Sequence, residues 1–242
     1  MGKKAETRKS FDDLAWRYDE WFSTEEGRYV DLYERRALLG FVKPSSADVL
    51  LDVGTGTGTY LLEAARHGAY VVGLDISREM LKVLAGKISR EGVESRVELV
   101  LGDAEHLPFR EGAFTKLVCN TVIEFTPKPD DAVSEFSRVL GKDGEVFIGV
   151  LTSTSVWAFR RWLKNLSGRN VYAGARFYTL GKLRSLLTRG KLVAIDCRWA
   201  VFAPPGCPSG LLPLFEGVER SLCHRRILGG FGAFLAVKAV RA

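Results

Sequence analysis

The stretch Leu51-Asp52-Val53-Gly54-Thr55-Gly56-Thr57-Gly58 constrains the fold of this chain more than any other. It completes a short apolar run over 48–53 and leads into a helix predicted over 57–67. A short apolar run closed by glycine is typical of a buried parallel strand. Alternating glycines let the backbone approach a ligand closely, and open α/β sheets bind ligands at the carboxyl ends of their strands. We therefore expect a ligand site at this turn.

The remainder of the chain alternates strands and helices at the spacing of βαβ units. Further strands are predicted at 70–75, 97–101, 115–120, 145–150, 192–200 and 231–240, and helices at 8–22, 25–41, 77–90, 130–140, 154–168, 179–188 and 211–226. These elements predict a doubly wound, mostly parallel seven-stranded α/β sheet. We expect a single domain over 1–242, made of an N-terminal helical cap (1–44), a cofactor-binding core (45–152), a substrate-side helical insertion after the fifth strand (153–190) and C-terminal strands and a helix (191–242).

Composition narrows the class of protein. The net charge of +6 is spread along the 242 residues rather than gathered in a stripe, so a nucleic-acid partner is possible but not favoured. The four cysteines form no CxxC pair, which indicates reduced thiols and no metal site. We expect a cytoplasmic protein without a signal peptide or membrane span. The absence of Gln, with only three Asn, fits a thermophile. The oligomeric state is left open.

The glycine spacing separates this turn from two other nucleotide sites. A dinucleotide fingerprint G-x-G-x-x-G would need glycine where Thr59 or Leu61 stands, and the Gly-Lys-Ser/Thr ending of a phosphate loop is missing. Asp52 precedes the first glycine by two positions. A carboxylate there would repel a pyrophosphate at the helix N-terminus. It would suit a cationic group, such as the ammonium of an amino acid.

Two more acids follow the next predicted strands. Asp75 ends the second strand, where a carboxylate can accept hydrogen bonds from both hydroxyls of a ribose. The alternative is that Asp75 caps the following helix. Asp103, in Gly102-Asp103-Ala104-Glu105-His106-Leu107-Pro108-Phe109, could accept a hydrogen bond from an adenine amino group. The alternative is a solvated loop carboxylate.

Four segments, DVGTGTG, VVGLD, GDAEHLPF and the strand ending VCN, together resemble the motifs of class I S-adenosylmethionine-dependent methyltransferases over about residues 47–150. The resemblance implies a Rossmann-like methyltransferase fold with S-adenosylmethionine as cofactor. It implies three roles: the methionine portion is held by Asp52, Gly54, Thr55, Gly56 and Gly58; the ribose by Asp75; and the adenine by Asp103 and Ala104, with Ile76 and Met80 near the ring. It also implies that Asn120 lies beside the sulfonium.

The N-terminal pattern Phe11, Ala15, Tyr18, Asp19 and Trp21 is similar to the cap helix of the ubiquinone/menaquinone-biosynthesis branch of that family, known as methyltransferase domain 11. The similarity implies that Tyr18 closes over the cofactor. An amphipathic helix that simply packs Phe11, Ala15, Tyr18 and Phe22 is an equal and compatible interpretation.

The function expected from the resemblance is in-line methyl transfer to a small hydrophobic or aromatic molecule, driven mainly by positioning. Glu124, Tyr178 and His106 are candidates for a base, and none is singled out. The alternatives are an RNA or protein methyltransferase, an NAD(P)-dependent oxidoreductase and a non-catalytic cofactor-binding protein. The aromatic-rich helix at 154–168 has three interpretations: core packing, which is favoured, a lid over the acceptor, or a membrane-surface helix.

Overall fold

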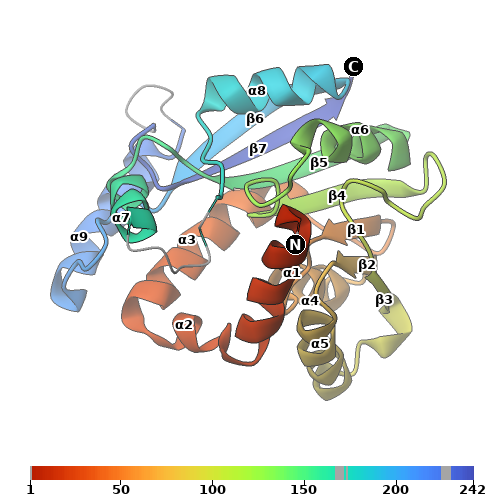
Figure 1. Ribbon diagram of the computed structural model, residues 1–242, viewed down its shortest axis with the longest axis horizontal. Helices are drawn as coiled ribbons and strands as arrows, with labels where there is room; N and C mark the ends of the chain where they lie inside the picture. Colours follow the sequence, from red (N-terminus) through yellow and green to blue (C-terminus); the bar gives the residue numbers. More distant parts are fainter. Residues whose placement is uncertain (1, 167–171, 173, 225–229) are drawn as a thin grey trace.

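The computed structural model describes residues 2–166, 172, 174–224 and 230–242, with residues 165 and 166 described by their backbone. Its centre is a seven-stranded sheet in the order β3-β2-β1-β4-β5-β7-β6 (Figure 1). The strands are β1 (Val49–Val53), β2 (Tyr70–Asp75), β3 (Val97–Leu101), β4 (Phe114–Asn120), β5 (Leu140–Leu151), β6 (Leu192–Ala200) and β7 (Phe234–Arg241). The predicted seven-stranded α/β sheet is therefore confirmed.

The strand directions create the site. β1 through β5 pair in parallel, whereas β7 runs antiparallel between β5 and β6. From β1 the chain first moves outward through β2 and β3, and then returns to add β4 on the other side of β1. The two crossovers leave a crevice beyond the carboxyl ends of β1 and β4, which is where open α/β sheets bind ligands.

Helices cover both faces of the sheet (Figure 1). Alternate residues of β1 belong to different cores: Leu51 packs with residues of α6 and α8, and Leu50 with residues of α3, α4 and α5. Because β1 is buried on both faces, its sequence reads as a continuous apolar run. The longer helices are α1 (Lys3–Leu14), α3 (Glu25–Val42), α4 (Thr59–Arg66), α5 (Arg78–Glu91), α6 (Pro129–Val139), α7 (Val156–Leu166), α8 (Leu180–Arg189) and α9 (Leu212–Leu222).

Capping residues explain where two of these helices begin. Ser77 is the N-cap of α5, because its hydroxyl accepts a hydrogen bond from the Met80 N–H at 3.1 Å. α4 begins at Thr59, two residues later than predicted. Gly58 adopts φ 93° as the residue before the helix, a conformation that only glycine takes easily.

The single helix predicted over 8–22 is wrong. The chain forms α1, then a 3₁₀ turn (Ala15–Arg17) and a short α2 (Glu20–Ser23). The break falls at Tyr18 and Asp19, and the Asp19 carboxylate is held by Thr57 and Lys87 of the core. Tertiary contacts therefore override the helical spacing of Phe11, Ala15, Tyr18 and Phe22.

Other boundaries differ less. β5 begins earlier than predicted, because Leu140 already pairs with Phe114 of β4 before the register shifts. β7 begins at Phe234 rather than 231, and α9 ends at Leu222, while 225 and 226 of the predicted helix lie outside the described residues. Positions 167 and 168, predicted to end the aromatic helix, also lie outside them. Within the described residues, no helix combines the length and apolar character needed to cross a membrane.

Candidate functional site

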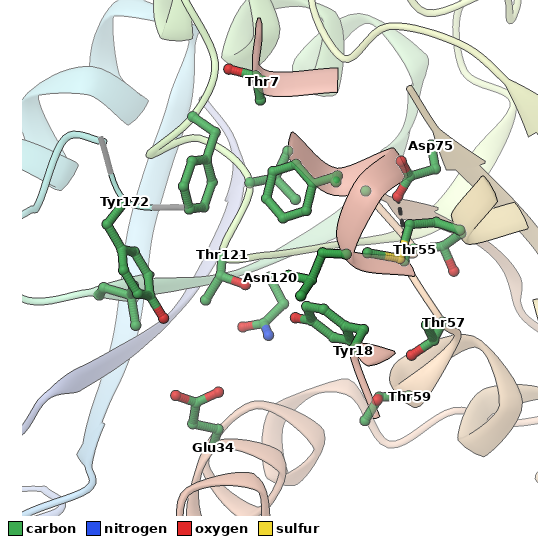
Figure 2. A pocket seen from close by; sticks show the side chains of 18 of the residues that line it. Thr7, Tyr18, Glu34, Thr55, Thr57, Thr59, Asp75, Asn120, Thr121 and Tyr172 are labelled. Atoms are coloured by element: carbon green, nitrogen blue, oxygen red, sulfur yellow. Dashed lines mark hydrogen bonds between the residues drawn. The ribbon is translucent and has the colours of Figure 1, made fainter. Parts of the chain in front are cut away.

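A cavity of about 470 Å³ lies at the carboxyl ends of β1, β2 and β4. Its walls come from the glycine turn, the N-terminal helices, the loops after β2, β3 and β4, and α7. In Figure 2, Asn120 and Thr121 lie between Asp75 on one side of the cavity and Tyr172 on the other. The cavity therefore has two ends, one beside the glycine turn and one between α3 and α7.

The structure brings eleven of the twelve predicted cofactor residues to the wall of this cavity. They are Tyr18, Asp52, Gly54, Thr55, Gly56, Asp75, Ile76, Met80, Asp103, Ala104 and Asn120. Gly58 stands apart from them, behind the turn. A Cβ at Gly58 would lie 2.2 Å from Leu84 Cδ1, so the glycine is needed for packing against α5.

Asp52 and Asp75 are buried carboxylates at the glycine-turn end. Asp52 is 2% exposed, its Oδ2 accepts a hydrogen bond from Thr55 Oγ1 at 2.8 Å, and burial raises its pKa to about 7. Asp75 accepts hydrogen bonds at 2.8 Å from the backbone N–H groups of Gly56 and Ser77, and burial raises its pKa as well. The helix cap itself is Ser77. Two buried acids that are reluctant to ionise favour a ligand that brings hydrogen-bond donors or positive charge.

Asp103 is not a freely solvated loop residue. Its Oδ2 contacts Lys4 Nζ at 2.5 Å, and the same ammonium contacts Glu105 Oε2 at 2.5 Å. The Asp103 Oδ1 accepts a hydrogen bond from the Glu105 N–H. No local pattern predicts Lys4 here, since Lys4 and Asp103 are far apart in the chain.

The N-terminal segment is attached to three successive loops of the core by polar contacts. Besides Lys4, the Asp12 carboxylate accepts a hydrogen bond from the Ser77 hydroxyl at 2.6 Å. Asp19 accepts one from the Thr57 hydroxyl at 2.7 Å. We call α1, the 3₁₀ turn and α2 together the cap; α1 contains no buried residue. The cap thus closes the cavity while contributing little to the core.

The middle of the cavity is a strained junction. Asn120 Oδ1 is buried without a hydrogen-bond partner, and a Cβ at Gly149 on the neighbouring strand would lie 2.1 Å from it. Thr121 and Val201, both in the cavity wall, have φ values of 51° and 64°. Positive φ is unfavourable for β-branched residues, and such strain concentrates at ligand sites.

The three candidate bases do not line the cavity. Glu124 is fully buried, and its Oε1 accepts a hydrogen bond from the Leu151 N–H at 2.7 Å. Tyr178 is buried, with its hydroxyl 3.4 Å from the Ile123 carbonyl. His106 is exposed on the surface of its loop.

Sequence reasoning missed Glu34, a carboxylate in the wall of the other end of the cavity. Figure 2 shows it pointing from α3 towards Asn120. Burial raises its pKa to about 8, although the positive charge of Arg161 acts in the opposite direction. One signal was present: Glu34 lies between Val30 and Ala37 at helical spacing, on the stripe of α3 that is otherwise apolar.

The aromatic helix α7 turns a charged residue towards the cavity and two of its aromatic residues towards solvent. Trp157 and Arg161 line the cavity, whereas Phe159 and Trp162 are 59% and 54% exposed. Core packing, the interpretation favoured from the sequence, is therefore wrong for the outward-facing aromatic residues. The inner face forms a wall of the cavity, and the lid and membrane-surface interpretations stay predictions.

Comparison with known proteins agrees with this geometry. Residues 51–148 match a family described as a methyltransferase domain. A demethylmenaquinone methyltransferase from Bacteroides fragilis is 28% identical over 187 residues, which cover 76% of this chain and 74% of the relative. An uncharacterized protein of Methanocaldococcus jannaschii is 32% identical over 146 residues; the match spans 60% of this chain and 62% of that protein.

The fold also has a solved counterpart. The crystal structure of an S-adenosylmethionine-dependent methyltransferase from Thermotoga maritima, titled a possible histamine N-methyltransferase, superposes with a TM-score of 0.72 at 21% identity. The superposition covers 97% of this chain and 99% of that one. The matched domain, the strand order and this superposition lead to one conclusion: residues 51–148 are similar to a methyltransferase domain, and the chain has the fold of class I S-adenosylmethionine-dependent methyltransferases.

Proposed function

We propose that this protein transfers the methyl group of S-adenosylmethionine to a small acceptor with an apolar or aromatic body. The observation that carries the proposal is that one cavity holds the predicted cofactor residues at one end and aromatic side chains at the other. The far end is bounded by Phe125, Trp157 and Tyr172. The match to a demethylmenaquinone methyltransferase supports an acceptor of this kind.

The residues at the glycine turn fit S-adenosylmethionine. Asp52 would face its ammonium and Asp75 its ribose hydroxyls, which would supply the positive charge and the donors that these buried acids lack. Asn120, with its unpartnered oxygen, would lie beside the sulfonium. Tyr18 and the cap would cover the cofactor and exclude water.

Positioning supplies most of the rate in this proposal. When bound, S-adenosylmethionine brings an already activated methyl group, so the protein has to align the acceptor with the bond that breaks. Glu34 is the carboxylate placed to take a proton from an acceptor that carries an O–H or N–H group. Its pKa of about 8 lies near the working range, where a base is most effective.

Ligand-induced heat stabilisation tests the proposal. S-adenosylhomocysteine at about 100 times its Kd is expected to raise the free energy of unfolding by about 2.7 kcal/mol, because it binds only the folded protein. NAD at the same concentration is expected to leave the melting temperature unchanged. Stabilisation by NAD alone would contradict the proposal and favour an oxidoreductase. Turnover is then tested by measuring the transfer of labelled methyl groups from S-adenosylmethionine to small hydroquinones and phenols.

The ligand-free protein is expected to lose stability as the pH rises from about 5 to about 8. Burial raises the pKa of Asp52 to about 7 and that of Glu34 to about 8, both above their values in the unfolded chain. The folded protein therefore binds more protons in this range, and stability falls with increasing pH. Melting temperatures across the range measure this fall, and Asp52→Asn should flatten it. A melting temperature that climbs steadily towards pH 8 in both proteins would refute the assignment.

A further inference from the structure

The acceptor end of the cavity contains a buried cation that forms no ion pair in the described part of the chain. Arg161 is 8% exposed and lines the cavity from the inner face of α7. Its Nη1 is buried without a hydrogen-bond partner. Within residues 2–166, 172, 174–224 and 230–242, no carboxylate lies within the 4.0 Å of an ion pair with this guanidinium.

Aromatic rings surround this guanidinium. Its Cζ lies 5.7 Å from the ring centre of Trp157, 5.4 Å from that of Tyr172 and 5.7 Å from that of Phe177. Contacts of a cation with ring faces stabilise it partly. They leave Nη1 without a hydrogen-bond acceptor, because a ring face is not a substitute for an anionic acceptor in the plane of the guanidinium.

The two nearby acids do not fill that role. The charge of Arg161 lowers the pKa of Glu34 and of Glu124 from a distance, but neither carboxylate forms an ion pair with it, and only Glu34 shares the cavity wall with it. Burying a cation without a partner is strongly unfavourable. A ligand that carries negative charge into the cavity would supply the missing partner and remove this cost.

We propose that Arg161 binds an anionic group, a carboxylate or a phosphate, attached to the apolar body of the methyl acceptor. The planar guanidinium offers parallel N–H donors to two oxygens of such a group. The rings of Trp157 and Tyr172 would pack against the acceptor's apolar part. The inference rests on the proposed methyltransferase function and adds the charge of the acceptor to it.

Small aromatic probes test the inference on the full-length protein saturated with S-adenosylhomocysteine. Benzoate, phenyl phosphate and the neutral benzamide have similar ring bodies, and ligand-observed NMR measures their weak affinities. The tighter-binding of the two anions is expected to bind at least about tenfold more tightly than benzamide, because a charge-assisted hydrogen bond is roughly twice as strong as a neutral one. The order of benzoate and phenyl phosphate tells which anion the site prefers.

Variants locate the effect. Arg161→Met is expected to abolish the preference for anions and to leave benzamide binding unchanged, and Arg161→Lys to retain part of it. The matched control is Arg184→Met, because Arg184 on α8 also has a buried Nε without a partner but does not line the cavity. The Arg184→Met protein is expected to prefer anions to the same degree as the wild type. The Arg161→Met protein is expected to melt at or above the wild-type temperature, because an unpaired buried charge is removed.

Two results would overturn the inference: equal binding of benzamide and the anions by the wild type, or an unchanged preference in Arg161→Met. A lower melting temperature of Arg161→Met with unchanged probe binding would assign Arg161 a structural role instead. Calorimetry with S-adenosylhomocysteine separates the two levels of the proposal. If the cofactor product binds and the anions show no preference, only the acceptor charge is wrong; if the product does not bind, the proposed function itself fails.

Discussion

Replacing Asp75 with alanine is expected to weaken the binding of S-adenosylhomocysteine by about 10² to 10⁴-fold. The estimate comes from two hydrogen bonds from ribose hydroxyls to a carboxylate, each contributing about 1.5–3 kcal/mol. The structure places this carboxylate at the wall of the cavity, 2.8 Å from the N–H of Gly56 in the glycine turn. Isothermal titration calorimetry of the variant and the wild type measures the loss.

Fold stability is expected to change much less in the same variant. The buried N–H of Ser77 loses its acceptor, which costs about 1–3 kcal/mol, and the part-buried N–H of Gly56 loses its acceptor at a smaller cost. Removal of a buried acid whose pKa is raised offsets part of that loss. Asp143→Ala is the control, because Asp143 is an exposed residue away from the cavity. Equal affinity of the Asp75→Ala protein and the wild type would refute the ribose assignment.

Gly54→Ala is expected to have the largest effect on stability, about 2–5 kcal/mol. Gly54 has φ 68°, a left-handed conformation that costs an L-residue about 1–2 kcal/mol. A Cβ there would also lie 2.2 Å from Val122 Cγ2, and overpacking a core typically costs about 1–3 kcal/mol. Urea denaturation followed by circular dichroism gives the difference in free energy of unfolding.

Gly56→Ala is the matched comparison two residues along the same turn. Gly56 has φ 53°, and a Cβ there would meet only the Gly54 carbonyl oxygen, at 4.0 Å. It therefore lacks the clash, and its destabilisation is expected to stay near the conformational cost of about 1–2 kcal/mol. If Gly56→Ala destabilises the protein as much as Gly54→Ala, the packing of Gly54 against Val122 is not what makes the turn intolerant.

The parts of the fold that sequence could predict are those governed by local rules. A strand buried on both faces reads as an apolar run, and the hydroxyl of Ser77 marks the start of α5. The positions of the acids at the ends of β1 and β2 could be predicted for the same reason. Parallel strands bring their carboxyl ends to one edge, so Asp52 and Asp75 had to meet there.

The parts that sequence could not predict depend on contacts between distant segments. The break in the N-terminal helix follows from Asp19 bonding to Thr57, and the ion pair of Lys4 with Asp103 joins residues 99 positions apart. Local rules predict the wrong orientation for α7, because aromatic side chains are usually buried in the core. In fact Arg161 turns inward, and only the cavity explains why a charge lies on the inner face.

The cap is joined to the core by charged and polar contacts and by the edge-to-face contact of Phe11 with Phe125, and α1 adds no buried residue. A cap attached in this way can move away from the cavity without disturbing the packing of the sheet. Salt screens charged contacts far more than it affects apolar packing. A higher ionic strength is therefore expected to speed the release of S-adenosylhomocysteine and to leave the stability of the sheet unchanged.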